Sequence, residues 1–94
     1  MLLEGKKALV TGGSRGIGKE IVRTFLRNGA DVYYISRSPG DSQEELGALA
    51  DELGRTVTYK EGNVGDEDTI SRVVSEVLEE SGGIDILVNN AGMT

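Results

Sequence analysis

The sequence predicts an α/β fold in which helices cover both faces of a doubly wound parallel sheet. Short apolar runs alternate along the chain with longer segments of helical periodicity. The run at residues 32–35 is continuous rather than alternating, as in a strand that is covered on both faces. Helical connections of this length give right-handed crossovers between parallel strands. We therefore expect four strands in the order 3-2-1-4, with a ligand site at the switch point between strands 1 and 4.

The first half of the chain contains two strands and two helices. A strand at Lys7–Thr11 is followed by a helix at about Arg15–Asn28, and Asn28-Gly29 is a typical C-terminal cap. A second strand at Asp31–Ser36 leads into a loop, Arg37-Ser38-Pro39-Gly40, and then into a helix at Ser42–Leu53. The residues expected on the buried faces of these helices are Ile17, Ile21, Val22, Phe25 and Leu26, and then Leu46, Leu49, Ala50 and Leu53.

The second half repeats the pattern with a strand at Thr56–Glu61, a helix at Glu67–Ser81 and a strand at Ile84–Val88. Acidic residues 66–68 lie where the helix dipole favours negative charge, and Gly82-Gly83 ends the helix. The inward residues of this helix are expected to be Ile70, Val73, Val74, Val77 and Leu78.

Composition excludes several classes of function. The 94 residues amount to one domain at most, with 10 Lys and Arg against 16 Asp and Glu, and the resulting net charge of −6 is unlike that of a nucleic-acid or anionic-membrane binder. The chain has no Cys and no His, which removes disulfides, a thiolate nucleophile and the commonest metal ligand and general base. Because the sequence has no apolar run of about 18 residues and no signal-peptide pattern, we expect a cytoplasmic protein.

A glycine-rich stretch, Thr11-Gly12-Gly13-Ser14-Arg15-Gly16-Ile17-Gly18, joins the first strand to the first helix. Small residues let the backbone approach a pyrophosphate closely, and the N–H groups of the first helical turn point at it. The alternative is an ordinary strand-to-helix turn, since glycine is common in turns. The position, directly after a buried-type strand and before an amphipathic helix, favours a dinucleotide site.

The glycines follow the spacing G-x-x-x-G-x-G rather than the common G-x-G-x-x-G. With Thr11 in front, this variant resembles the short-chain dehydrogenase/reductase family, whose members have a Rossmann-type fold. Asn63-Val64 after the third strand and Asn89-Asn90-Ala91-Gly92 after the fourth are similar to family segments beside the adenine and its ribose. The cofactor-binding residues that the motif and the resemblance imply are Gly12, Gly13, Ser14, Arg15, Gly16, Ile17, Gly18, Arg37, Asn63, Val64, Asn90, Ala91 and Gly92.

The end of the second strand indicates which dinucleotide is bound. An enzyme that prefers NAD normally has an acid there to accept from the ribose 2′-OH, whereas this chain has Ser36-Arg37. Arg37 together with Arg15 suits a 2′-phosphate, so we expect NADP(H). The alternative for Arg37 is a solvated loop charge.

Within the family, the segment looks most like the N-terminal part of a 3-oxoacyl-[acyl-carrier-protein] reductase, a cytoplasmic enzyme of fatty acid biosynthesis. The resemblance implies NADPH-dependent reduction of a carrier-bound or small-molecule carbonyl compound by a parent enzyme that is a homotetramer. The family's catalytic Ser and Tyr-x-x-x-Lys pair have no counterpart in this chain, because none of Tyr33, Tyr34 and Tyr59 is followed four residues later by Lys. We therefore expect no catalytic or metal-binding residue in residues 1–94, which are read as the cofactor-binding portion of a domain.

Three alternatives remain open on the sequence alone. The chain could be a stand-alone dinucleotide-binding module without catalysis, or part of a short-chain dehydrogenase with another alcohol or ketone substrate. A nucleotide-sugar epimerase is disfavoured by the glycine spacing and by the missing acid after the second strand. An isolated cofactor-binding portion leaves its fourth strand as an apolar edge. We accordingly expect marginal stability or self-association.

Overall fold

The computed structural model describes residues 2–12, 16–37, 42–63 and 65–89. Four parallel strands form one sheet in the order β3-β2-β1-β4, which confirms the predicted topology. The elements are β1 (Lys7–Thr11), α1 (Gly16–Arg27), β2 (Asp31–Ser36), α2 (Ser42–Leu53), β3 (Val57–Glu61), α3 (Glu67–Ser81) and β4 (Ile86–Asn89).

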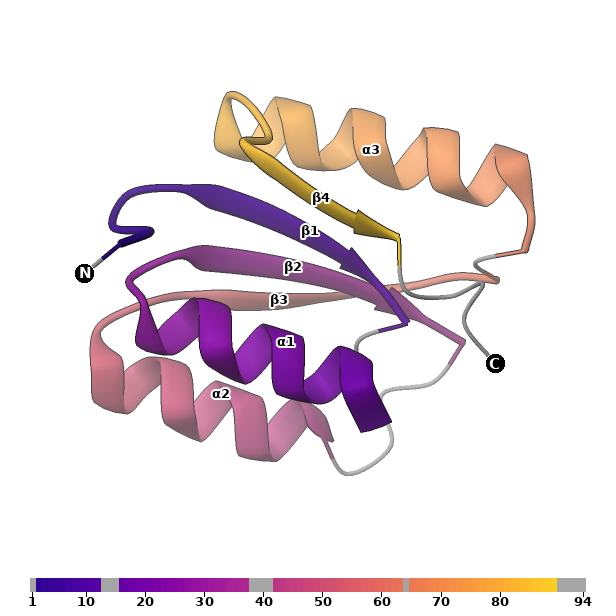
Figure 1. The fold of residues 1–94 in the computed structure, drawn as a ribbon. Coiled ribbons are helices and arrows are strands. Elements are labelled where there is room, and N and C mark those ends of the chain that lie inside the picture. The colour runs from indigo at the N-terminus through magenta and orange to yellow at the C-terminus, as the bar shows by residue number, and fades with distance from the viewer. Residues whose placement is uncertain (1, 13–15, 38–41, 64, 90–94) are drawn as a thin grey trace.

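Helices α1 and α2 cover one face of the sheet and α3 covers the other (Figure 1). The apolar core is accordingly divided between the two faces. The larger cluster lies under α1 and α2, and the smaller one joins Leu9 and Ile35 to Val73 and Val77 of α3. Strand β2 contributes to both clusters, as its continuous apolar run predicted.

The helix ends follow the predicted signals. Helix α1 ends at Arg27, and Gly29 after it takes a φ of 95°. The carboxylate of Asp66 accepts a hydrogen bond from the backbone N–H of Asp68 at the start of α3, and Gly82 after its last turn is left-handed. The ends of two strands differ from the prediction: β3 begins at Val57, and β4 covers Ile86–Asn89.

Two residues predicted to be buried are exposed. Ile17 is 64% exposed and Leu78 is 46% exposed, although both fall on the apolar stripe of their helices. In α1 and α3, the apolar stripe therefore extends beyond the part of the helix that packs on the sheet. A helical period identifies the apolar face of a helix, but the area of that face that is buried depends on what lies opposite.

Asp31 ties together the amino ends of three strands. Its carboxylate lies 2.8 Å from Nζ of Lys7 on β1 and accepts from the backbone N–H and hydroxyl of Thr56, just before β3, at 2.9 and 3.1 Å. Burial raises the pKa of this carboxyl, but hydrogen bonds from Lys7 and Thr56 lower it by more, so that the net pKa lies below the ordinary value of 3.8.

We expect Asp31→Asn to lower the free energy of unfolding at pH 7 by about 2 kcal/mol, because it removes the charge from these hydrogen bonds. Since the folded pKa is depressed, the stabilisation from Asp31 is fully present above the unfolded pKa and is lost as the pH falls through the folded pKa, below 3.8. Urea unfolding at pH 7 and between pH 4 and pH 2.5 measures both effects. The exposed Asp51→Asn is the control. Equal loss of stability with acid in Asp31→Asn and in the unaltered chain would contradict this role.

Candidate functional site

The carboxyl ends of the four strands lie together along one side of the sheet, which we call the carboxyl edge (Figure 1). Thr11 at the end of β1 is in register with Ile35 of β2 on one side and with Asn89 of β4 on the other. In open α/β sheets, ligands bind outside the carboxyl ends of the strands, where the strand order reverses. Here the reversal lies at β1, because β2 and β4 flank it.

The glycine turn after β1 has the backbone that its sequence predicts. Gly12 has a φ of 72° and donates its N–H to the carbonyl oxygen of Ile35 at 2.7 Å, which holds the start of the turn against β2. Gly16, the first residue of α1, has a φ of 62°, and a Cβ added to it would meet no atom of the described residues within 4 Å apart from its chain neighbours and the helix backbone. Open space therefore lies beside a left-handed backbone at the amino end of a helix. This geometry suits a phosphate group.

Gly18 and Ile17 have different surroundings in the first turn of α1. Gly18 is buried and is followed along the helix by the buried Val22 and Leu26, which pack on the sheet. Ile17 is largely exposed, so its side chain belongs to the outer surface. Any contact of Ile17 with a phosphate would therefore come from its backbone N–H, one of the first four helical donors that have no partner within the helix.

Thr11 and Asn89 lie together at the switch point. Both belong to the motifs that the sequence singled out, although neither was named among the cofactor-binding residues. The Thr11 hydroxyl lies 3.3 Å from the Val88 carbonyl oxygen and 3.2 Å from Oδ1 of Asn89. This contact ties the start of the glycine turn to the end of β4. Thr11 and Asn89 are the last residues of two strands that pair side by side. Their positions at these strand ends are the feature of the sequence from which the contact could have been predicted.

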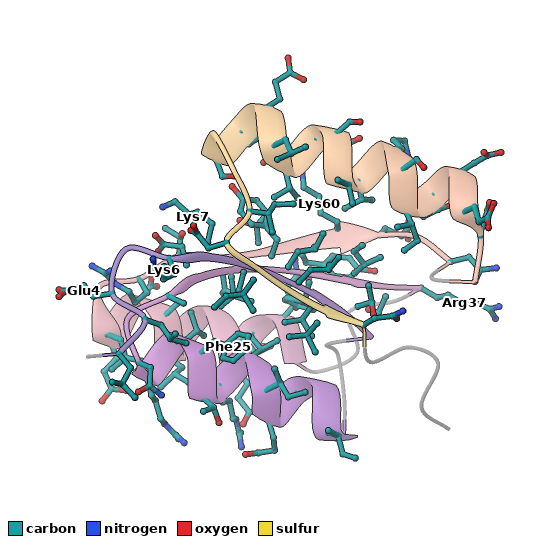
Figure 2. The ribbon with its side chains drawn as sticks, turned by 45° about the horizontal axis from the view of Figure 1, so that its top comes forward. Glu4, Lys6, Lys7, Phe25, Arg37 and Lys60 are labelled. Carbon is teal, nitrogen blue, oxygen red and sulfur yellow. The ribbon has the colours of Figure 1, made fainter. Side chains whose placement is uncertain are left out.

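Arg37 follows β2 and is exposed, projecting beyond the carboxyl end of the sheet (Figure 2). The residue before it is held firmly, because the Ser36 carbonyl oxygen accepts from the Tyr59 hydroxyl at 2.9 Å and from the Gly62 N–H at 3.0 Å. Ser36 is in register with Glu61 of β3. Glu61 therefore places a carboxylate at the end of the strand next to Arg37. The sequence alone did not single out this residue.

Asn63 orders the connection between β3 and α3. Its side-chain oxygen accepts from the Gly65 N–H at 2.9 Å, and its carbonyl oxygen accepts from the Asp66 N–H at 3.0 Å. Asn63 is exposed at the same edge of the sheet as Arg37. The other residues expected to bind the cofactor lie outside the described residues; they are Gly13, Ser14, Arg15, Val64, Asn90, Ala91 and Gly92.

The tyrosines have the environment of strand residues. Burial raises the pKa of Tyr34, aided by Tyr59, and burial together with nearby Glu61 raises the pKa of Tyr59 despite its hydrogen bond to Ser36. A raised phenol pKa is the opposite of what a general base at neutral pH requires. In the described ranges there is no group of three or more Asp or Glu side chains able to hold a metal ion, and no helix long and apolar enough to cross a membrane.

Comparison with known proteins agrees with this geometry. The family model for short chain dehydrogenases matches residues 6–94. A 3-oxoacyl-[acyl-carrier-protein] reductase of Vibrio cholerae is 45% identical over 94 residues, which are all of this chain and 37% of that protein. An uncharacterized oxidoreductase of Thermotoga maritima is 40% identical over 94 residues, covering 98% of this chain and 36% of that protein.

Solved structures show the same fold. A short chain dehydrogenase from Burkholderia cenocepacia, in complex with NADP, matches with a TM-score of 0.86 at 38% identity, covering 95% of this chain and 36% of that one. The chain thus spans about a third of the length of its relatives. On its strand order, its glycine turn and these matches, the chain belongs to the short-chain dehydrogenase family of oxidoreductases.

Proposed function

We propose that this chain supplies the NADP(H)-binding portion of an NADPH-dependent carbonyl reductase. The observation that carries the proposal is the pairing of an open, left-handed glycine turn after β1 with Arg37, rather than an acid, after β2. The Burkholderia cenocepacia relative, which is in complex with NADP, supports the choice of cofactor.

In this proposal, residues at the carboxyl ends of different strands bind different parts of the dinucleotide. The glycine turn and the first turn of α1 receive the diphosphate, and Arg37 pairs with the 2′-phosphate through charge-assisted hydrogen bonds. Asn63 and the segment Asn90–Gly92 border the adenine and its ribose, as the family resemblance implies. The bound cofactor would supply the hydride. The proton-transfer residues of the reaction belong, in this proposal, to another portion of the parent enzyme.

The substrate class that we favour is a 3-oxoacyl chain on an acyl carrier protein, reduced to the 3-hydroxyacyl form. Support comes from the reductases of that name in Vibrio cholerae and Chlamydia pneumoniae, which are 45% and 44% identical to this chain. A different alcohol or ketone is the second candidate, because the zerumbone synthase of Zingiber zerumbet is also 44% identical.

We expect Arg37→Asp to weaken NADPH binding by about tenfold to a hundredfold and to leave NADH binding unchanged or improved. The reason is that one charge-assisted contact to a 2′-phosphate contributes about 1.5–3 kcal/mol, whereas an acid at this position can accept from a 2′-OH. Titrating NADPH and NADH with the protein and following the nicotinamide fluorescence measures the two affinities and their ratio.

Glu61→Gln is the control, since it changes the charge at the neighbouring strand end in the opposite sense, by one unit against the two units of Arg37→Asp. An unchanged NADPH-to-NADH ratio in Arg37→Asp would overturn the assignment to NADP. A switch of preference in Glu61→Gln alone would place the selecting residue on β3. If the unaltered chain bound neither nucleotide, the binding role itself would be rejected.

A further inference from the structure

The carbonyl oxygen of Ser36 is held by two donors at the point where β2 ends. It accepts from the Tyr59 hydroxyl at 2.9 Å and from the Gly62 N–H at 3.0 Å, and these donors come from β3 and from the residue directly after it. Ser36 is buried, whereas Arg37 next to it is exposed. The chain therefore changes from a fixed strand to an open surface between these two residues.

Tyr59 approaches this carbonyl from two residues back along β3. It is in register with Tyr34, and the two ring centroids lie 5.4 Å apart at an interplanar angle of 49°. Aromatic pairs at this spacing attract one another, which holds the Tyr59 ring beside β2. Burial raises the pKa of the Tyr59 phenol, and the nearby Glu61 carboxylate adds to this, against the lowering effect of the hydrogen bond with Ser36. The hydroxyl therefore keeps its proton and remains a donor throughout the neutral pH range.

Helix α3 holds the second donor in place. Nη2 of Arg72 donates to the Glu61 carbonyl oxygen at 3.2 Å. A Cβ added to Gly62 would overlap Cγ2 of Thr69, so a larger residue would force the chain away from α3. The residues at the end of β3 are thus fastened to a helix, and they present the Gly62 N–H to β2 in a fixed position.

Holding the Ser36 carbonyl also holds the start of Arg37. A peptide bond is planar, so the Ser36 carbonyl oxygen lies in one plane with the N and Cα atoms of Arg37. Two hydrogen bonds to that oxygen constrain the orientation of the plane, and with it the direction in which the Arg37 side chain leaves the carboxyl edge (Figure 2). A long side chain loses conformational entropy when it binds a ligand, and a fixed starting point reduces that loss.

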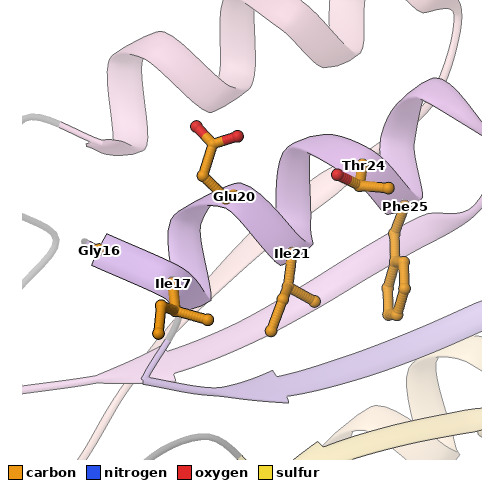
Figure 3. A pocket seen from close by; sticks show the side chains of 6 residues that line it. All are labelled: Gly16, Ile17, Glu20, Ile21, Thr24 and Phe25. Atoms are coloured by element: carbon orange, nitrogen blue, oxygen red, sulfur yellow. The ribbon is translucent and has the colours of Figure 1, made fainter.

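A second open surface near the glycine turn does not suit a 2′-phosphate. A pocket of about 590 Å³ runs along α1, and the ionisable side chain among its described lining residues is that of Glu20, whose charge would repel a phosphate (Figure 3). The lining residues are Gly16, Ile17, Glu20, Ile21, Thr24 and Phe25. Recognition of the 2′-phosphate therefore falls to the β2 and β3 side of the turn, where Arg37 lies.

Resting on the proposed function, we propose that Tyr59 is a positioning residue that increases the preference for NADP(H) over NAD(H). Its hydroxyl, together with the Gly62 N–H, holds the peptide between Ser36 and Arg37 so that the guanidinium meets the 2′-phosphate. Glu61 offers a competing carboxylate at the neighbouring strand end, so a guanidinium without this alignment would be drawn away from the phosphate. NAD(H) has no 2′-phosphate and gains nothing from the alignment.

Tyr59→Phe removes the hydroxyl and keeps the ring beside Tyr34. We expect it to weaken NADPH binding by about twofold to tenfold, the range that one neutral hydrogen bond accounts for, and to leave NADH binding unchanged. In an Arg37→Ala background the same substitution should have no further effect on the ratio of the two affinities. Titrating NADPH and NADH with each protein and following the nicotinamide fluorescence measures this double-mutant cycle.

Tyr33→Phe is the matched control, because it makes the same chemical change on β2 at a side chain that packs on the α3 face of the sheet. It should leave the NADPH-to-NADH ratio unchanged. A purely structural role of Tyr59 would lower the stability in urea, or both affinities alike, with the ratio unchanged, and would overturn the proposal. Gly62→Ala displaces the other donor and should lower the ratio in the same direction, which tests the proposal even if Tyr59→Phe does not fold.

The NMR order parameter of the Arg37 N–H tests the positioning without any nucleotide. We expect a value of about 0.85 in the unaltered chain, as for rigid backbone, and a lower value in Tyr59→Phe. Equal values in the two proteins would overturn the positioning role. If Arg37→Ala lowers the NADPH-to-NADH ratio and Tyr59→Phe does not, the positioning role alone is rejected. If Arg37→Ala leaves the ratio unchanged, or the unaltered chain binds neither nucleotide, the proposed function is rejected and the role of Tyr59 in selection with it.

Discussion

Gly16→Val is expected to reduce the affinity for NADPH by at least tenfold. The φ of 62° at Gly16 lies in the left-handed region, which a β-branched residue adopts only with strain. The open space beside its Cα would be filled by the valine methyl groups at the place proposed for the diphosphate. Fluorescence titration with NADPH and urea unfolding measure affinity and stability on the same samples.

Gly16→Asn separates the two causes of this loss of affinity, which are backbone strain and the filling of the space proposed for the diphosphate. Asparagine tolerates the left-handed region better than valine but also has a side chain, so it should recover stability more than affinity. Gly47→Val on α2, where the added Cβ also meets open space and φ is not in the left-handed region, controls for a glycine replaced far from the site. Full NADPH affinity in Gly16→Val would exclude a phosphate site at this turn.

Leu9→Ala is expected to lower the free energy of unfolding by about 2–5 kcal/mol. Leu9 is completely buried in the smaller core cluster, where it joins the sheet to Val73 and Val77 of α3. A domain of this size has a total stability of only about 5–15 kcal/mol, so the loss is a large fraction of it. Urea unfolding followed by circular dichroism measures the change.

Leu87→Ala makes the same chemical change at the position in register with Leu9 on β4. Because Leu87 is 61% exposed, we expect this variant to be within about 0.5 kcal/mol of the unaltered chain. Equal destabilisation by the two substitutions would mean that Leu87 is covered in solution, for example by a second copy of the chain.

Local signals in the sequence predicted most of the fold. Helices α2 and α3 have the predicted bounds, because acidic residues at the start of α3 and a left-handed glycine after it mark its ends. The strand order was expected from the doubly wound arrangement of alternating strands and helices, and the observed pairing confirms it. The start of β4 was placed two residues early, since Ile84 packs in the core as a strand residue would but precedes the pairing with β1.

The candidate site was predicted less completely. The glycine turn could be recognised because its backbone requires residues without a Cβ, and Gly12 and Gly16 have the positive φ values expected of such a turn. The contact between Thr11 and Asn89 spans 78 residues of sequence and depends on the pairing of β1 with β4. Glu61 likewise comes near the end of β2 only through the register of β3.

The sequence by itself determined the kind of element at each position and the place of the glycine turn, because these follow from local periodicity, caps and backbone freedom. The strand order was expected from the doubly wound arrangement that alternating strands and helices adopt. Only the tertiary structure decided which apolar residues are buried. Ile17 and Leu78 have the same helical pattern as their buried neighbours, yet both are exposed, because the described residues of the sheet pack against only part of each helix. Burial depends on what packs against a side chain, and a periodic pattern does not contain that information.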